Sequence, residues 1–250
     1  MGAVKKQFLN SWDMSRTARI APKECIYHLL TRGNNRKGIF KNENDYTRYI
    51  EIIKKYKFKH KFKLYHYVLM RNHVHLVLEL TAKGGNLAEI MKGINLSYTQ
   101  YYKSRYKHAG HFWQDRYKSI IISSDEYLLA CGSYVELNPL RAKIAEHPKD
   151  YKWSSFNAYA YGKGNTIVVD EHPIYKLLSE NEKERMKKYR RYVKGMINKK
   201  NSLKGEMDGR LIYGSENFIE KMNMTYRIEA KKKPKGRPKK HEKGPALIHY

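Results

Sequence analysis

Residues Tyr67–Leu80 read YVLMRNHVHLVLEL, and this stretch decides the fold. It is rich in Val and Leu and is bounded by polar segments, a pattern that predicts buried β-strands. Arg71 and Asn72 interrupt the apolar run, so we expect a tight turn or bulge there. Because side chains along a strand alternate between its faces, His73 and His75 share one face, about 7 Å apart along the backbone.

Two neutral imidazoles on one rigid strand are suited to bind a divalent metal ion, because the strand fixes them with little loss of side-chain entropy. The alternative is that they border a groove and hydrogen-bond nearby. Glu79 falls on the same face of the strand, where it either orients a metal ligand or lies at the solvent-exposed end. The histidine pair by itself leaves these interpretations open.

Strand and helix patterns alternate around this stretch. Turn residues and β-favouring runs predict strands over Cys25–Arg32, Phe62–Met70, His73–Leu80 and the end of Phe112–Ser123. Apolar residues at helical spacing predict helices over 45–60, 87–106 and 125–137. The order β-α-β-β-α-β-α is typical of an α+β fold, a ferredoxin-like antiparallel sheet with its helices packed on one face.

A basic and mainly helical segment follows this core. Asn181–Lys199 is predicted as a strongly basic amphipathic helix, and Gly209–Met222 as a short helical piece. From Lys231 the tail KKKPKGRPKKHEKG holds eight Lys or Arg residues against one Glu and too little apolar mass to fold. We therefore expect four parts: a basic N-terminal arm (1–22), a core domain (23–158), a basic helical extension (159–230) and a polybasic, disordered tail (231–250).

The overall charge points to a polyanionic partner. The chain has 51 Lys and Arg against 24 Asp and Glu, a net charge of +27, which favours nucleic acid over the competing anionic membrane surface. No stretch of 18 apolar residues is present, and Met1–Asn10 lacks the apolar core of a signal peptide. Cys25 and Cys131 are too few and too far apart for a disulfide scaffold or a zinc knuckle. These features predict a soluble protein of a reducing compartment, with no membrane partner.

A second motif, SYVELNP, falls on the last of the predicted core helices. Tyr134 and Asn138 are four residues apart, so they share a helix face with about 6 Å between their Cβ atoms. Asn138 then supplies a neutral oxygen beside His73 and His75, a donor set for Mg²⁺ or Mn²⁺ that leaves positions open for phosphate and water. Tyr134 would attack phosphorus as a covalent nucleophile. The alternative is that Tyr134 packs in the core and Asn138 ends the helix.

Four segments, in this order and spacing, resemble the HUH single-tyrosine transposases, and most of all the REP-associated tyrosine transposases: MRNHVHLVLE, FWQDRYKS, YVELNPLRA and YKWSS. The resemblance runs from about Cys25 to Ser155, roughly half of the chain. It implies a ferredoxin-like HUH nuclease core with the histidine pair on a central strand. It also makes residues 23–158 the catalytic domain.

The same resemblance implies a metal-dependent transposase and endonuclease that cleaves and rejoins single-stranded DNA near REP-like hairpins. It implies that Tyr134 is the nucleophile, whose attack leaves a 5′-phosphotyrosine and a free 3′-hydroxyl. It implies that His73, His75 and Asn138 bind the metal ion, Mg²⁺ or Mn²⁺. The expected setting is the nucleoid in a prokaryotic cytoplasm, with the protein a monomer or homodimer. The active site forms either within one chain, the interpretation that we favour, or across a dimer.

Basic and polar residues beside these segments are candidates for DNA binding: Arg32, Asn34, Asn35, Arg36, Arg116, Lys118 and Arg141. In the tail, KGRP resembles an AT-hook core that lies in the minor groove of A·T tracts, which adds Lys235 and Arg237. An unspecific polybasic tail explains the same residues. Trp113 either joins the DNA-binding set or anchors the core, the interpretation that we favour.

Other functions stay open at this point. The chain is alternatively a non-catalytic nucleic-acid-binding module on the same fold, with aromatic side chains stacking on bases. A metal-dependent nuclease without a covalent intermediate and a replication initiator of the same superfamily are further alternatives. Tyr98, Tyr101 and Tyr102 compete with Tyr134 as nucleophile, but their helical stripe fits core or stacking positions better.

Overall fold

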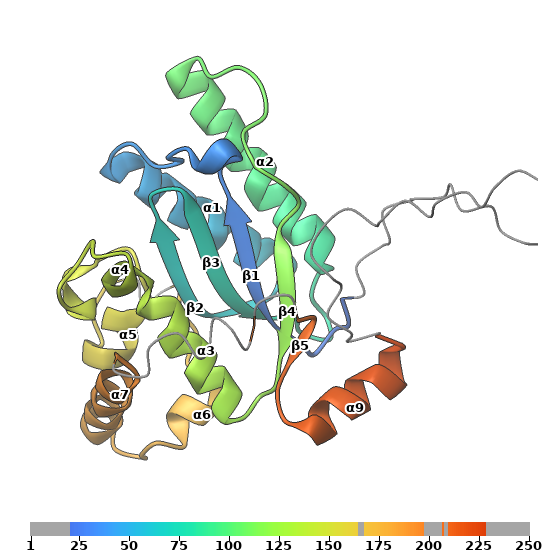
Figure 1. The fold of residues 1–250 in the computed structure, drawn as a ribbon, viewed down its shortest axis with the longest axis vertical. Helices are drawn as coiled ribbons and strands as arrows, with labels where there is room; N and C mark the ends of the chain where they lie inside the picture. The colour runs from blue at the N-terminus through green and yellow to red at the C-terminus, as the bar shows by residue number, and fades with distance from the viewer. Residues whose placement is uncertain (1–20, 165–167, 198–206, 208–209, 229–250) are drawn as a thin grey trace, which may run out of the picture.

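The computed structural model describes residues 21–164, 168–197, 207 and 210–228. A five-stranded sheet lies at its centre (Figure 1), in the order β2-β3-β1-β4-β5. The strands are β1 (Ile26–Arg32), β2 (Lys63–Met70), β3 (His73–Glu79), β4 (Lys118–Ile122) and β5 (Ile212–Tyr213). Nearly all of the predicted N-terminal arm and the whole predicted tail lie outside the described residues.

Helices connect and flank the strands. In the first part of the chain they are α1 (Glu43–His60), α2 (Leu87–Tyr106), α3 (Glu126–Glu136) and α4 (Asn138–Arg141), with the 3-10 turns η1 (Asn34–Arg36) and η2 (Pro148–Asp150). Later ones are α5 (Phe156–Tyr161), α6 (Pro173–Lys176), α7 (Glu182–Ile197) and α9 (Glu216–Tyr226). The predicted boundary at residue 158 therefore falls inside α5. No helix in the described ranges has both the length and the apolar character needed to cross a membrane.

β2 and β3 form the hairpin that the sequence predicts. Met70 pairs with His73, so Arg71 and Asn72 make the two-residue turn between them. β1 lies between β3 and β4 and is antiparallel to both. The predicted α+β class and its antiparallel core are confirmed. β5, which no pattern in the sequence predicts, pairs with β4 in the parallel sense.

Helices cover both faces of the sheet (Figure 1), which corrects the expectation that they pack on one face. α1 and α2 pack on the face that presents Tyr27, Leu29 and Leu76, and together they form the largest apolar core. α3 packs on the other face, with its apolar residues against Val68 and Val77. The reason lies in β2, where every residue after Lys63 is buried. A strand that is apolar on both sides needs a cover on both sides.

The C-terminal extension packs on α3 rather than standing apart. α7 contacts α5 and α6, the hydroxyl of Tyr175 on α6 donates to the carbonyl of Tyr159 on α5, and α6 and α7 also contact α3. Their shared apolar cluster includes Leu129 and Leu137 from the α3 region and Tyr159, Tyr175 and Tyr189 from the extension. The predicted basic helix is confirmed as α7, and its apolar side packs in the cluster that it shares with α3, α5 and α6.

Candidate active site

The histidine pair lies on the face of β3 that α3 covers. The ring centroids of His73 and His75 are 5.1 Å apart; His75 is buried and His73 half-buried. Nδ1 of His73 lies 2.6 Å from Oδ1 of Asn72. Because a carbonyl oxygen only accepts, Nδ1 carries the hydrogen and Nε2 of His73 keeps its lone pair.

Both imidazoles are held in their neutral form. Burial, together with the Arg32 guanidinium, lowers the pKa of His73 from 6.5 to about 4. Burial also holds the pKa of His75 well below its usual value. Repulsion of a protonated His75 by His28, His73, Arg141 and Arg32 acts in the same direction. The neutral imidazole is the form that binds metal ions.

A third imidazole, missed by the sequence analysis, supports the pair. Nε2 of His28 on β1 lies 2.8 Å from Nδ1 of His75, and the two rings stack with centroids 5.0 Å apart. With the hydrogen on Nδ1 of His75, His28 accepts it and Nε2 of His75 keeps its lone pair. In the β1–β3 register Leu30 lies opposite His75, and His28, two residues before Leu30, points to the same face. Strand alternation in IYHLLTR could therefore identify His28 as a site residue only once this register was known.

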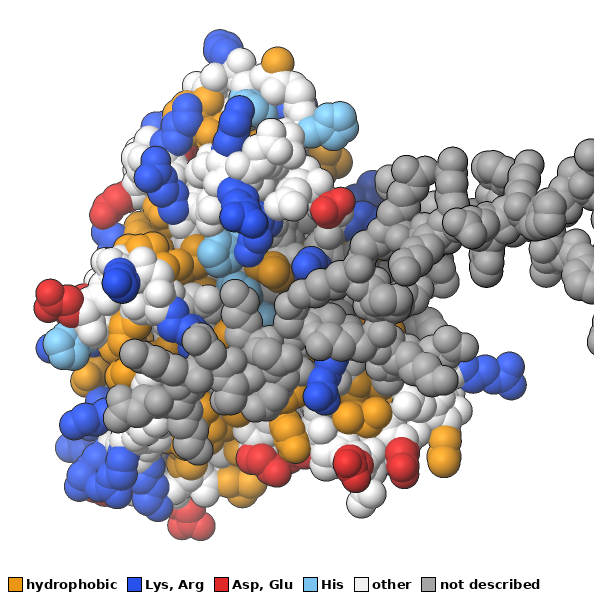
Figure 2. Space-filling view, viewed as in Figure 1, with side chains coloured by type: hydrophobic (Ala, Val, Ile, Leu, Met, Phe, Trp, Pro, Cys, Tyr) orange, Lys and Arg blue, Asp and Glu red, His pale blue; other side chains and the backbone are white. Residues whose placement is uncertain are grey.

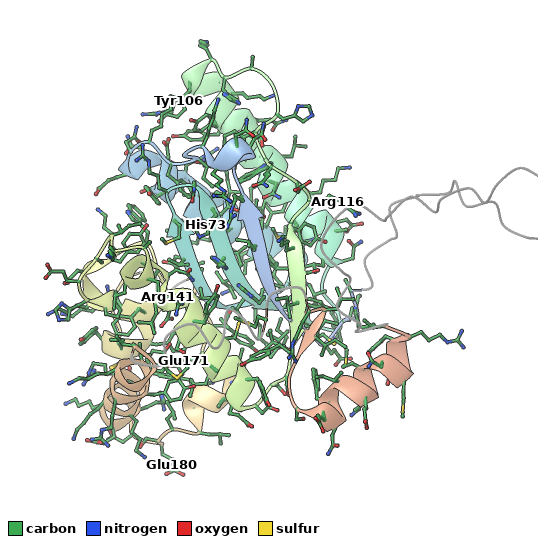
Figure 3. All side chains as sticks on the ribbon, viewed as in Figure 1. His73, Tyr106, Arg116, Arg141, Glu171 and Glu180 are labelled. Atoms are coloured by element: carbon green, nitrogen blue, oxygen red, sulfur yellow. The ribbon has the colours of Figure 1, made fainter. Side chains whose placement is uncertain are left out.

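α3 brings Tyr134 to these histidines. The ring of Tyr134 lies edge-on to those of His75 and His28, at centroid distances of 6.1 and 6.0 Å. The guanidinium of Arg141 lies 4.3 Å from the centre of the Tyr134 ring, and it donates to the backbone carbonyl of Tyr134. Figure 3 shows Arg141 near the C-terminal end of α3, below His73 on the sheet. The sequence analysis gave Arg141 to DNA alone and missed its contact with the tyrosine.

Asn138 and Tyr134 lie on two helices, which corrects the expectation that the whole motif SYVELNP lies on one helix; the predicted end near residue 137 is close to the observed one. α3 ends at Glu136, and Asn138 begins α4 with Pro139 in its first turn. The side-chain amide of Asn138 donates to the carbonyls of Tyr134 and Val135, each at 3.0 Å. It thus satisfies carbonyls at the end of α3, and its amide oxygen is the atom that would serve a metal. Its role as a ligand stays a prediction.

The predicted donor set, two imidazoles and one amide oxygen, is of the kind that suits a divalent cation, and the metal site stays a prediction. In the part of the chain that the structure describes, no group of three or more His, Cys, Asp or Glu side chains is arranged to hold a metal ion. Asn72 and His28 engage Nδ1 of His73 and His75, the outer contact that metal-bound histidines usually make. Two imidazole nitrogens and the amide oxygen of Asn138 would leave the remaining positions to water and phosphate.

Basic residues surround the end of the sheet beside the histidines. Arg32 lies opposite His73 in the β1–β3 register, and Lys118 is exposed on the same sheet face. The other predicted DNA contacts of this region lie outside the strands: Asn34, Asn35 and Arg36 in η1, and Arg116 before β4, labelled in Figure 3. Figure 2 shows histidine surface near the middle of this view, with Lys and Arg side chains gathered above it.

Some predicted site residues lie elsewhere. His73 begins β3 and Glu79 ends it, so the two lie at different ends of the strand. There Glu79 forms a salt bridge with Lys63 at 3.3 Å and accepts a hydrogen bond from the Tyr65 hydroxyl. These contacts favour the alternative that Glu79 lies at the solvent-exposed end of the strand over the alternative that it orients a metal ligand. Lys235 and Arg237, in the segment resembling an AT-hook, lie outside the described residues.

The competing aromatic residues belong to the opposite face of the sheet. The hydroxyl of Tyr98 is buried and donates to the carbonyl of Ile39 at 2.6 Å. The indole N–H of Trp113 donates to the carbonyl of Asn95 at 3.2 Å, and its ring packs on the same core. Both therefore act in packing, in line with the interpretations favoured above.

The chain is similar to known transposases in sequence and in fold. Residues 21–138 match the family model for IS200-like transposases. A solved REP-associated tyrosine transposase bound to a REP hairpin is similar in fold, with 19% identity and a TM-score of 0.51 over 60% of this chain and 87% of that chain. A putative transposase from Deinococcus radiodurans aligns at 17% identity and a TM-score of 0.35, over 54% of this chain and 97% of that chain. A search of curated proteins finds no match.

Proposed function

We propose that this chain, whose residues 21–138 match the family model for IS200-like transposases, cleaves and rejoins single-stranded DNA through Tyr134. The observation that carries the proposal is the environment of that side chain. Its ring meets the imidazoles of His28 and His75 edge-on, and burial keeps both of these neutral by lowering their pKa. The ring also lies beside the guanidinium of Arg141. A module that only binds DNA has no need for this grouping, whereas attack on a phosphodiester uses each part of it.

In the proposed reaction the phenol of Tyr134 loses its proton to solvent and its oxygen attacks the phosphorus of one phosphodiester. The bond from phosphorus to the tyrosine oxygen forms, and the bond from phosphorus to the 3′ oxygen breaks. The 3′ oxygen takes up a proton and leaves as a hydroxyl, while the 5′ side stays attached as a phosphotyrosine. Because one phosphoester replaces another, a 3′-hydroxyl can reverse the step and rejoin DNA without ATP.

Neighbouring side chains have distinct parts in this reaction. Arg141 stabilises negative charge at the tyrosine oxygen and the phosphate. His73 and His75, oriented by Asn72 and His28, would hold Mg²⁺ or Mn²⁺ through Nε2, with the oxygen of Asn138 as a further donor. A divalent cation bound there would polarise the scissile phosphate.

We extend the proposal to a hairpin substrate of the REP type. The solved relative is bound to a REP hairpin. The net charge of +27 favours a polyanion, and exposed Lys and Arg residues flank the histidines (Figure 2). We propose that Arg32, Arg116 and Lys118 contact phosphates of the DNA; Arg32 lies opposite His73, and Lys118 is exposed on the same sheet face. Since Tyr134 meets histidines of its own chain, we propose that the site forms in cis.

The test is incubation with labelled single-stranded hairpins and Mn²⁺, followed by a denaturing gel and mass spectrometry. We expect a covalent DNA adduct on Tyr134 in the wild type and none in Tyr134→Phe. Cleavage that persists in the variant would point to a nuclease that uses water. Tight binding without cleavage in both proteins, across a library of hairpins, would favour the binding module.

A further inference from the structure

A buried carboxylate lies two residues beyond the proposed nucleophile. Glu136 is 0% exposed and occupies the last turn of α3. A charge in such a place is costly unless hydrogen bonds surround it. The partners of Glu136 therefore show what the protein must keep in place around α3.

Those partners come from three separate parts of the chain. Nδ1 of His66 on β2 lies 2.9 Å from Oε1 of Glu136, and the hydroxyl of Ser155 donates to the same oxygen at 2.6 Å. The hydroxyl of Tyr189 on α7 donates to Oε2, also at 2.6 Å. Burial and the Glu136 carboxylate raise the pKa of Tyr189 well above its usual value, so its phenol stays a donor. α7 thus adds a hydrogen bond to the apolar contacts that it makes with α3, the helix that carries Tyr134.

β2 has a β-bulge beside the residue that contacts this carboxylate. The β2–β3 register shifts between Leu64 and His66, which makes Tyr65 an extra residue in the strand. A bulge of this kind re-aims the side chains that follow it. It sets His66 on the α3 face, where Gly132 allows close approach, because any Cβ at Gly132 would collide with the His66 ring.

The extension also holds the opposite end of α3. The Tyr213 ring of β5 lies edge-on to that of Tyr127 in the first turn of α3, with centroids 4.8 Å apart. The amide of Ser123, just before α3, donates to the carbonyl of Tyr213 at 3.0 Å. Both ends of the helix that carries Tyr134 are therefore held by residues from the extension.

We propose that the C-terminal extension is a clamp on the tyrosine helix, and that Tyr189 is a positioning residue which acts on Tyr134 through Glu136. The proposal rests on the proposed function, because it assigns the clamp the task of keeping the nucleophile aimed. A tyrosine that is held beside the histidines needs no rearrangement before attack, and a misplacement of about 1 Å costs such a step up to about a hundredfold.

The test removes one hydroxyl from each of two buried tyrosines. Tyr189→Phe deletes the bond to Glu136 and keeps the ring. Tyr175→Phe is the matched control, because its hydroxyl lies in the same apolar cluster but donates to the backbone carbonyl of Tyr159 at 2.8 Å. Each full-length protein is compared with wild type for adduct formation at saturating hairpin, hairpin Kd, thermal stability and hydrogen exchange of α3 amides.

We expect Tyr189→Phe to slow adduct formation at least about tenfold, with an unchanged hairpin Kd and faster amide exchange in α3. Tyr175→Phe should match wild type in rate at a temperature where both remain folded. A second variant, Glu136→Gln, keeps the side-chain shape but loses the charge, and it should show the same separation of rate from Kd.

The outcomes separate the clamp from the proposed function. Wild-type rate and wild-type α3 exchange in Tyr189→Phe would overturn the clamp while leaving the function standing. Equal slowing in both tyrosine variants would also overturn it, since loss of stability would then explain the effect. A wild-type protein that forms no adduct with any hairpin would overturn the proposed function, and exchange in α3 would still decide whether Tyr189 holds the helix.

Discussion

The two faces of the sheet are built from the same strands, yet they carry different chemistry. On the α1–α2 face, Tyr98 is buried among apolar and aromatic rings and donates to a backbone carbonyl. On the α3 face, Tyr134 meets His28, His75 and Arg141. A tyrosine becomes a candidate nucleophile through its neighbours, and the two-residue alternation of the strands decides which neighbours it has.

The largest expected effect separates these two tyrosines. Tyr134→Phe should abolish the covalent adduct, because the attacking oxygen is gone. Tyr98→Phe should keep the adduct and lose about 1 kcal/mol of stability, the usual contribution of one hydrogen bond. Adduct formation and urea unfolding of both variants measure the contrast. Adduct formation by Tyr134→Phe would break the comparison between the faces.

A smaller effect is expected from the residues that orient the histidines. Asn72→Ala removes the acceptor that fixes Nδ1–H of His73, so Mn²⁺ affinity should fall about tenfold or more. Calorimetric titration of the metal into the DNA-free protein measures this loss. Asn34→Ala, in the neighbouring η1 turn, is the control and should bind Mn²⁺ as wild type does. Equal affinities in all three proteins would argue against the orienting role.

Acid should destabilise the fold through His28, a buried histidine on the α3 face. Burial lowers the pKa of His28 from 6.5 to about 4, so between these values the unfolded chain binds a proton that the folded chain does not. The free energy of unfolding should therefore fall as the pH drops through this window, by about 1.4 kcal/mol per pH unit for His28. Urea unfolding at several pH values measures the slope.

His28→Gln should flatten this pH dependence, because glutamine does not titrate. His111→Asn, which changes an exposed histidine of the loop before β4, should leave the slope unchanged. The same slope in His28→Gln and wild type would mean that other groups cause the acid sensitivity.

The smallest effect is expected at the rim of the site. Lys118→Ala should weaken hairpin binding a few-fold and lower the salt dependence of log Kd by about one unit, as loss of a single phosphate contact does. Its adduct rate at saturating DNA should stay that of wild type. Lys54→Ala on α1, which is exposed away from this face, is the matched control. Equal salt slopes for both variants would place the DNA elsewhere.

Much of the fold could be predicted from local sequence patterns. The turn at Arg71 and Asn72 was predictable because two polar residues interrupt an apolar run. α2 was predicted with its observed bounds, since its apolar stripe is long and regular. The sharing of one face by His73 and His75 follows from strand alternation alone and is confirmed by their ring contact.

Features set by tertiary pairing were not predictable. His28 reaches His75 because of the β1–β3 register, which no local pattern specifies. The break after Glu136 moves Asn138 onto its own short helix, and β5 is only two residues long. The clamp on α3 joins residues far apart in the chain, so spacing gave no sign of it.

The order of the elements along the chain also bears on how the protein is made. The histidines and Tyr134 leave the ribosome before α7, which supplies Tyr189. With the clamp as proposed, a growing chain already has its nucleophile but does not yet hold it in place. Premature termination before α7 would then give a product that binds DNA more readily than it cuts it.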